Sequence, residues 1–511
     1  MKREMKAQRL FCTILLALIV LTVGAQQRIP CLRDIPDDVP KTTRGFLGYP
    51  YQDWDPQKTY RQLVVLITFL DTDFSVDDPV VYYLSLLNEP GFNEGYGQGS
   101  VADYFRDQSE GRFNLQFDVY GPFQVNQNAK KDEKLNYGVS AMEDAIMSLI
   151  STTDIDYSLY DWNGDGHVNQ VLFIAAGPCG NQIPGHIWPN TGVFGTFGTS
   201  RRATFDMSSI TCEMWADSTS CGIGTICHEF SHCLGLPDIY PTVKDDFSVV
   251  DEWDLMDGGN YTNKGWCPPN YSATSKMLMG WAQPIELTEP ATITGMKPVS
   301  EGGETYIIRN SGNENEFYIL ENRRRTKWDY GLPGEGLAIF HVDYDRDLWS
   351  SNKVNNDKTH YRYDLFHADG MGYRDWDPAN NGRDMNKYTM DNWMRNCYLS
   401  TSVYPYADSF VENQSLTDDS YPKASVYAVN ADGVNLMSKP ITNIRMADDG
   451  TISFDFMKDP TSVAPIRYAA NASSEAEAWY DLNGSRLPSA PSRPGIYIRH
   501  SPDGTTRKIV K

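Results

Sequence analysis

The sequence contains His228-Glu229-Phe230-Ser231-His232, which continues through Gly235 to Asp238. Two histidines four residues apart on a helix lie about 40° from each other around its axis, so both imidazoles can reach one zinc ion. Glu229 follows the first histidine and can take a proton from a water bound to that ion. Gly235 can adopt the left-handed conformation that ends a helix, after which Asp238 returns as a third ligand. The pattern predicts a zinc site with an adjacent general base.

The residues around this motif favour a buried helix. Four apolar residues recur at helical spacing and predict one apolar face: Ile226, Phe230, Cys233 and Leu234. Gly222 and Gly224 precede the helix, where we expect a tight turn or a close backbone approach. The chain has only 8 histidines, and two of them fall in this motif.

A second acidic residue competes for the place of third zinc ligand. Glu252 lies twenty residues after His232, a separation at which another group of zinc peptidases supplies a glutamate ligand. We prefer Asp238, because that other group does not need the extension through Gly235. A tight turn carrying Met256, within 251–259, would lie beneath the metal.

Tyr261 follows this turn in the sequence. Its hydroxyl is a candidate donor to the oxyanion of a tetrahedral intermediate, so we group it with Glu229 as a catalytic candidate. The alternative is that a tyrosine falls here by chance, since the chain has 30.

A second metal site is predicted within 161–169. Oxygen-bearing side chains stand at alternate positions and glycine at the sixth, as at the start of a calcium loop. The twelfth position is Leu172 and a strand follows, which departs from an EF-hand. A structural Ca²⁺, completed by Asp154 or Asp156, competes with a plain polar turn. The candidate ligands are Asp161, Asn163, Asp165 and Asn169.

The composition is that of a globular protein, with 511 residues, 41% of them hydrophobic and 22% charged. The formal net charge of -22 excludes nucleic acid as the expected partner, because phosphate binding needs a cationic surface.

The N-terminus predicts a signal peptide over 1–25. Basic residues precede an apolar run over 10–23, and Val23-Gly24-Ala25 offers small residues for cleavage. The run is short for a membrane span, so we expect a secreted or surface protein without a stable span after cleavage; an uncleaved anchor is the alternative. Eight cysteines follow this segment, which permits disulfides without giving their pairing.

The rest of the chain divides by composition. A polar lead or short pro-segment over 26–60 precedes a region over 61–285 in which helices alternate with strands. Residues 286–458 favour short strands, and 370–417 show little periodicity. The expected strands are 61–70, 168–176, 305–309, 317–321, 337–342 and 452–456, and the expected helices are 100–107 and 140–150. This pattern predicts an α+β fold, a sheet with the zinc helix packed on it, followed by a β-rich part.

The stretches 224–240 and 253–259 resemble the M6, or immune inhibitor A-like, family of secreted zinc metallopeptidases. Weaker support comes from 99–109, 161–166, 332–336 and 341–344. This resemblance implies a metzincin-like catalytic domain over 61–285, one catalytic zinc, often structural calcium, and protein or peptide substrates.

The C-terminal tail, 459–511, has a resemblance of its own. Its segments 479–484, 494–498 and 507–511 are similar to the end of a type IX secretion sorting domain. Such domains direct export across an outer membrane and sometimes attachment to the cell surface, so the resemblance implies one or both for this chain. A last β-hairpin of the preceding domain is the alternative.

Together these observations predict a secreted zinc endopeptidase that hydrolyses peptide bonds through a zinc-bound water activated by Glu229. One alternative is a non-catalytic, metal-stabilised surface-binding protein, which would be expected to have lost Glu229. A zinc hydrolase of non-peptide amides or esters is the other.

Overall fold

The computed structural model describes residues 54–132, 135–199, 201–243, 248–372, 399–408 and 412–458, with short pieces between 478 and 510. The chain forms two compact units, 1–458 and 459–511. The predicted signal peptide and the lead up to residue 53 lie outside the described residues.

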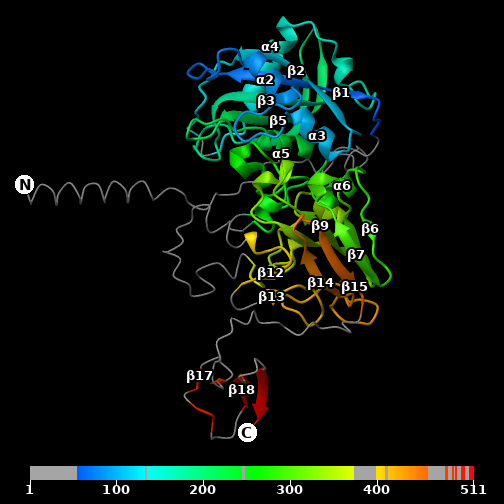
Figure 1. Ribbon diagram of the computed structural model, residues 1–511. Helices are drawn as coiled ribbons and strands as arrows, with labels where there is room; N and C mark the ends of the chain where they lie inside the picture. Colours follow the sequence, from blue (N-terminus) through cyan, green and yellow to red (C-terminus); the bar gives the residue numbers. More distant parts are fainter. Residues whose placement is uncertain are drawn as a thin grey trace, which may run out of the picture. The chain divides into compact units, whose positions relative to one another are not determined.

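The first half of the larger unit is built on a five-stranded sheet (Figure 1). Its strand order is β2-β1-β3-β5-β4; four strands run parallel, and β4 is antiparallel at the edge. Both predicted strands of this half form, over slightly shifted ranges, as β1 and β3. The strands are β1 (Thr59–Thr68), β2 (Asn114–Gln124), β3 (Val168–Pro178), β4 (Asn190–Phe197) and β5 (Ala203–Met214).

Helices cover both faces of this sheet. Because side chains alternate along a strand, Leu63 and Val65 of β1 pack with helix α4 (Val139–Thr152) on one face. Val64 and Leu66 point to the other face, where they join the core formed with α2 (Pro79–Asn88), α3 (Val101–Gln108) and α5 (Gly224–Cys233). In Figure 1, α4 and α5 accordingly lie on opposite sides of the sheet.

Two helices begin close to their predicted positions. The expected serine cap of α3 is present, because the Ser100 hydroxyl accepts a hydrogen bond from the Asp103 amide and the Asp103 carboxylate accepts one from the Ser100 amide. Helix α4 was expected over 140–150 and extends by about one residue at its start and two at its end.

The α5 helix is buried, as the sequence predicts. Every residue from Gly224 to Cys233 is buried. Beyond the first sheet, His228 contacts the Leu255 carbonyl and Ser231 contacts the Tyr271 hydroxyl. Segments that follow the helix in the sequence therefore cover part of α5 as well.

The second half of the unit consists of short helices and of sheets that are antiparallel except where residues 285–286 pair in parallel with 306–307. The short helices η3 (Asp251–Trp253), η4 (Gly259–Gly265), α6 (Ala273–Leu278), η5 (Val299–Glu301), η6 (Lys327–Gly331) and α7 (Arg346–Ser350) lie between or beside strands, as η2 (Tyr157–Tyr160) does in the first half. The main sheet has the order β11-β10-β9-β8-β6. Its strands are β6 (Ile285–Glu286), β8 (Tyr306–Asn310), β9 (Asn313–Arg323), β10 (Gly336–Asp343) and β11 (Tyr363–Leu365).

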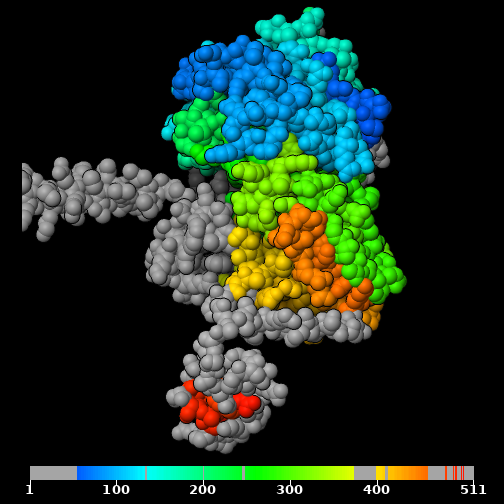
Figure 2. All heavy atoms as spheres, viewed as in Figure 1, coloured from blue at the N-terminus to red at the C-terminus, as the bar shows by residue number. Residues whose placement is uncertain are grey.

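A smaller sheet joins the two ends of this half. Strand β15 (Ile452–Phe456) pairs with β14 (Ile441–Met446) and with β7 (Ala291–Met296), although β7 lies far upstream in the sequence. Figure 2 shows the orange residues near 450 lying against the green residues near 290. A third pairing joins β12 (Tyr406–Ala407) to β13 (Glu412–Asn413). The four strands predicted in this half all form.

The smaller unit, 459–511, contains an antiparallel sheet of order β17-β16-β18-β19. Its strands are β16 (Ala478–Tyr480), β17 (Arg486–Leu487), β18 (Ile496–His500) and β19 (Thr506–Val510). Among the described residues, no helix has the length and apolar character needed to cross a membrane. The fold is mixed α/β with several sheets.

Candidate metal centre

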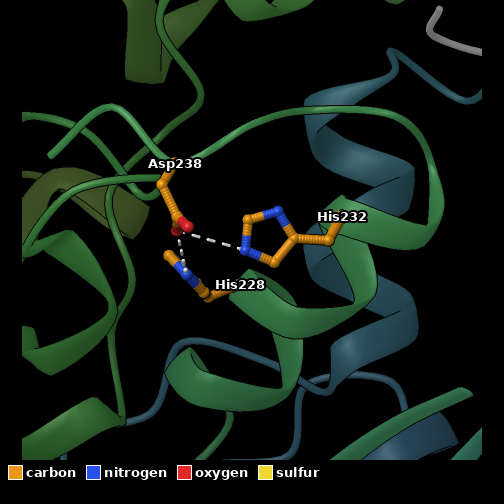
Figure 3. Close-up of side chains that lie close together, drawn as sticks. All are labelled: His228, His232 and Asp238. Carbon is orange, nitrogen blue, oxygen red and sulfur yellow. Dashed lines mark ion pairs between the residues drawn. The ribbon is translucent and has the colours of Figure 1, made fainter. Parts of the chain in front are cut away.

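Three predicted ligands meet at one point (Figure 3). Nε2 of His228 lies 3.3 Å and Nε2 of His232 lies 3.2 Å from the same carboxylate oxygen, Oδ1 of Asp238. The three side chains are buried. The two histidines come from α5, and Asp238 comes from the segment that follows the helix.

Gly235 makes the return of the chain possible. It has a φ of 104°, in the region that favours glycine, and its amide bonds to the carbonyl of His232. The Leu236 amide bonds to the Ser231 carbonyl, which completes the helix end. The helix therefore ends at Cys233, directly after His232, and the chain turns back toward the two imidazoles, as the sequence predicts.

Backbone carbonyl groups orient both imidazoles. Nδ1 of His228 lies 2.8 Å from the carbonyl oxygen of Leu255, and Nδ1 of His232 lies 2.7 Å from that of Leu236. A carbonyl can only accept, so each Nδ1 carries the proton and each Nε2 presents its lone pair toward Asp238.

This donor set fits zinc. Two neutral imidazoles and a carboxylate are typical ligands of a catalytic zinc site, and hydrogen bonds from the second ring nitrogen are the usual outer support. Burial acts to raise the pKa of Asp238, but when the two imidazoles carry a second proton, their charge and their hydrogen bonds outweigh burial and lower that pKa well below its usual range. The carboxylate is therefore ionised, as metal binding requires.

Glu229 lies on α5, and its side chain contacts the edge strand of the first sheet. Oγ1 of Thr191, on β4, lies 2.8 Å from Oε2 of Glu229 and 2.9 Å from the Glu229 carbonyl oxygen. The Glu229 side chain is buried and stands one residue after the first histidine. The expected general base therefore belongs to the same helix turn as the ligand group.

The turn carrying Met256 lies next to the ligand group. Its Leu255 carbonyl meets His228, and the Met256 carbonyl accepts a hydrogen bond of 2.8 Å from the Ile239 amide. The turn thus contacts both the helix histidine and the residue after Asp238. Glu252, the competing ligand, is half-buried and does not belong to the group of His228, His232 and Asp238.

Tyr261 lies at the start of η4 and is half-buried. Its ring contacts that of Trp215, with centroids 5.7 Å apart. Its hydroxyl accepts a hydrogen bond of 3.3 Å from Nδ2 of Asn181.

The predicted calcium loop is a tight turn that uses its own side chains. The Asp161 carboxylate accepts hydrogen bonds from the amides of Gly164 and Gly166. Asn163 bonds to Asp165, and Oδ1 of Asn169 accepts from the Trp162 amide. Asp165 also groups with two residues that the sequence did not suggest as ligands, His167 and Asp206, whose side chains lie 2.9 Å apart.

Three residues near the metal group were not predicted as site residues. Thr191 contacts Glu229, and Tyr240 stacks on the His228 ring with centroids 6.4 Å apart. Asn352 contacts Asp238 from 114 residues downstream. Tyr240 lies in the stretch that resembles the M6 family, whereas only the three-dimensional fold brings Thr191 and Asn352 to the site.

Comparison with known proteins agrees with this geometry. Residues 186–282 match the family model described as immune inhibitor A peptidase M6, catalytic domain. The matched segment contains Glu229, Met256 and the three ligand residues. This match confirms, over residues 186–282, the predicted resemblance to the M6 metallopeptidase family.

One curated relative is Immune inhibitor A of Bacillus thuringiensis subsp. alesti. It is 26% identical over 300 residues, which cover 52% of this chain and 39% of that protein. The chain therefore spans well under half of the length of this relative.

Proposed function

We propose that the chain is a zinc-dependent endopeptidase with a metzincin-like catalytic domain. The observation that carries this proposal is the buried group of His228, His232 and Asp238, with Glu229 on the same helix. Bound there, zinc would polarise the scissile carbonyl and increase the acidity of a water.

Glu229 performs the proton transfers. Its carboxylate takes a proton from the attacking water and delivers it to the leaving amine. Thr191 supports this role, because its hydroxyl restrains the carboxylate on the side of β4. Strand β4 forms the edge of its sheet, so an extended peptide can add to it as a further strand close to Glu229.

The test is zinc content and cleavage of an unfolded protein such as casein, for the wild type and Glu229→Gln. We expect about one zinc in both and a loss of about 10²- to 10⁴-fold in turnover for Glu229→Gln. Full activity of this variant with zinc bound would contradict the role of Glu229. Zinc without cleavage in the wild type would favour either a non-catalytic binding protein or a zinc hydrolase of non-peptide substrates. Assays on a panel of amides and esters would distinguish these two alternatives.

A matched pair of variants decides the third ligand. We expect Asp238→Asn to lose most of its zinc, because an amide is a much weaker ligand than a carboxylate. Glu252→Gln should keep its zinc, since Glu252 stands outside the ligand group. The reverse pattern would assign the metal to Glu252.

Tyr261 is proposed to donate a hydrogen bond to the oxyanion. Support comes from its position directly after the Met256 turn and from its half-exposed side chain. Tyr261→Phe should lower kcat about 10²- to 10³-fold with little change in zinc content. An unchanged kcat would leave Tyr261 as a packing partner of Trp215.

Calcium is proposed to stabilise the turn at 161–169. Support comes from the oxygen-bearing side chains of Asp161, Asn163, Asp165 and Asn169, which occupy one short segment at the start of β3. Millimolar Ca²⁺ should raise the melting temperature of the wild type but not of Asp161→Asn. An equal response of both proteins would identify the segment as a plain polar turn.

We further propose that the protein is exported and that its tail directs sorting. The apolar N-terminal run supports export, and the tail forms a compact unit of its own. Deletion of 459–511 should leave peptidase activity intact and abolish surface attachment. Unchanged surface attachment would remove the sorting role.

A further inference from the structure

A cluster of three asparagines holds the segment that carries Asp238. Asn352, Asn355 and Asn356, which we call the asparagine cluster, follow helix α7 in the β-rich half. Nδ2 of Asn355 donates to the Ile239 carbonyl at 2.8 Å. Oδ1 of Asn356 accepts from the Thr242 amide at 2.7 Å. The segment from Asp238 to Thr242 is thus fixed by side chains more than a hundred residues downstream.

Within this cluster, Asn352 contacts the metal-binding side chain itself. Its Nδ2 donates a hydrogen bond of 2.8 Å to Oδ2 of Asp238, and its Oδ1 accepts one of 2.7 Å from the Asp238 amide. Both residues are buried, Asp238 completely. Oδ1 of Asp238, the other carboxylate oxygen, is the one that faces the two imidazoles.

The conformation of Asn352 suits this task. Its φ is 55°, in the left-handed region that asparagine tolerates better than most residues. Its own carbonyl accepts a hydrogen bond of 2.9 Å from the Thr242 hydroxyl, which ties its backbone to the same segment. Hydrogen bonds therefore fix both the backbone of Asn352 and its side-chain amide.

We propose that Asn352 is a positioning residue for Asp238, so that the metal centre is completed from beyond the M6-matched segment. This proposal rests on the proposed zinc site. By holding Oδ2, the Asn352 amide prevents rotation of the carboxylate and leaves Oδ1 directed at the position between the imidazoles. Removal of such an outer partner typically weakens metal binding about 10- to 100-fold.

The experiment measures the zinc dissociation constant by chelator competition on the full chain. Asn352→Gly removes the side chain without straining the left-handed backbone. Asn352→Asp keeps the acceptor for the Asp238 amide but replaces the donor to Oδ2 by a carboxylate oxygen. Asn356→Gly is the matched control, because it removes an asparagine that binds the same segment but not Asp238.

We expect both Asn352 variants to bind zinc about 10- to 100-fold more weakly. The Asn356→Gly control should stay within about threefold of the wild type. Melting temperatures of the zinc-free proteins supply a second readout. A purely structural role would lower them for Asn352→Gly and Asn356→Gly alike, while leaving the dissociation constant unchanged.

The outcomes separate this proposal from the proposed function. Wild-type affinity in the Asn352 variants, with one zinc bound, would overturn the positioning role and leave the peptidase proposal intact. A wild-type protein that binds no zinc would overturn both. Should Asn352→Gly fail to fold, Asn352→Asp decides the matter, since it has nearly the same shape and tolerates the same backbone conformation.

Discussion

The Thr191 hydroxyl contacts both the side chain and the backbone of Glu229, at 2.8 Å from Oε2 and 2.9 Å from the carbonyl oxygen. Thr191 belongs to the edge strand β4, whereas Glu229 belongs to the central helix α5. This contact joins the two elements at Glu229, the proposed general base. The position of Glu229 thus depends on the first sheet as well as on its own helix.

The first prediction concerns Thr191→Val, which keeps the shape of the side chain but removes the hydroxyl. We expect zinc content to remain near one, because no ligand is touched. kcat/KM for casein should fall about 10- to 100-fold, since a small displacement of a catalytic group has effects of this size.

The control is Thr196→Val on the same strand, where an exposed hydroxyl contacts the hydroxyl of Thr204 and lies away from Glu229 in the sequence and on the strand. It should leave kcat/KM within about twofold. Equal activity of Thr191→Val and the wild type would show that Glu229 is held by other contacts.

The second prediction concerns the buried Arg323, behind the Met256 turn. Its guanidinium makes two bonds of 2.8 Å to Asp329 and lies 3.1 Å from Glu321 and 3.4 Å from the Trp253 carbonyl. Arg323→Met would leave two buried carboxylates without their cation, so we expect a loss of about 3–5 kcal/mol in the free energy of unfolding.

Urea denaturation of the zinc-loaded protein measures this loss. The control is Arg325→Met, at an exposed position two residues away, which should change the unfolding free energy by less than about 0.5 kcal/mol. Similar curves for the two variants would argue against a structural role of the Arg323 network.

The third prediction concerns pH and the cap of α3. Burial acts to raise the pKa of Asp103, but hydrogen bonds from the Gly91 and Ser100 amides and the Arg106 guanidinium outweigh it and lower that pKa. A carboxyl with a lowered pKa stabilises the fold above its unfolded value of about 3.9. This stabilisation is lost as the pH falls through the folded value.

Asp103→Asn should therefore destabilise the protein by about 1 kcal/mol at pH 7, and by progressively less below about pH 4. Urea unfolding of both proteins over this pH range measures the difference. The exposed Asp144→Asn serves as control and should show little effect at any pH. A difference for Asp103→Asn that stays constant with pH would contradict the ionic origin of the effect.

Local spacing explains what could be predicted from the sequence. Each of three features depends on a few neighbouring residues and takes the expected conformation. They are the two histidines His228 and His232 on one helix, the left-handed Gly235 and the serine cap at Ser100. The strongest apolar runs likewise form strands close to their expected limits. These features need no knowledge of distant contacts.

Contacts between distant segments could not be predicted in this way. Thr191 and Asn352 lie 38 and 114 residues from their partners, and neither belongs to a recognisable pattern. Burial of α5 was predicted, but its contacts with Leu255 and Tyr271 were not, because they lie well downstream of the helix. A periodic pattern shows which face of a helix is apolar but not how many elements surround it.

The last prediction concerns the start of α5, where two backbones approach closely. A Cβ added at Gly224 would lie less than 3.0 Å from the Asn260 carbonyl oxygen in η4, although the φ of Gly224 is ordinary. Gly224→Ala must therefore push α5 and η4 apart, which should cost about 1–3 kcal/mol in unfolding free energy and weaken zinc binding. The control is Gly433→Ala, where φ is 80° but no atom lies within 4 Å of the added Cβ. It should cost about 1 kcal/mol through backbone strain alone and leave zinc affinity unchanged. Unchanged zinc affinity in Gly224→Ala would mean that the ligand group tolerates a shift of its helix.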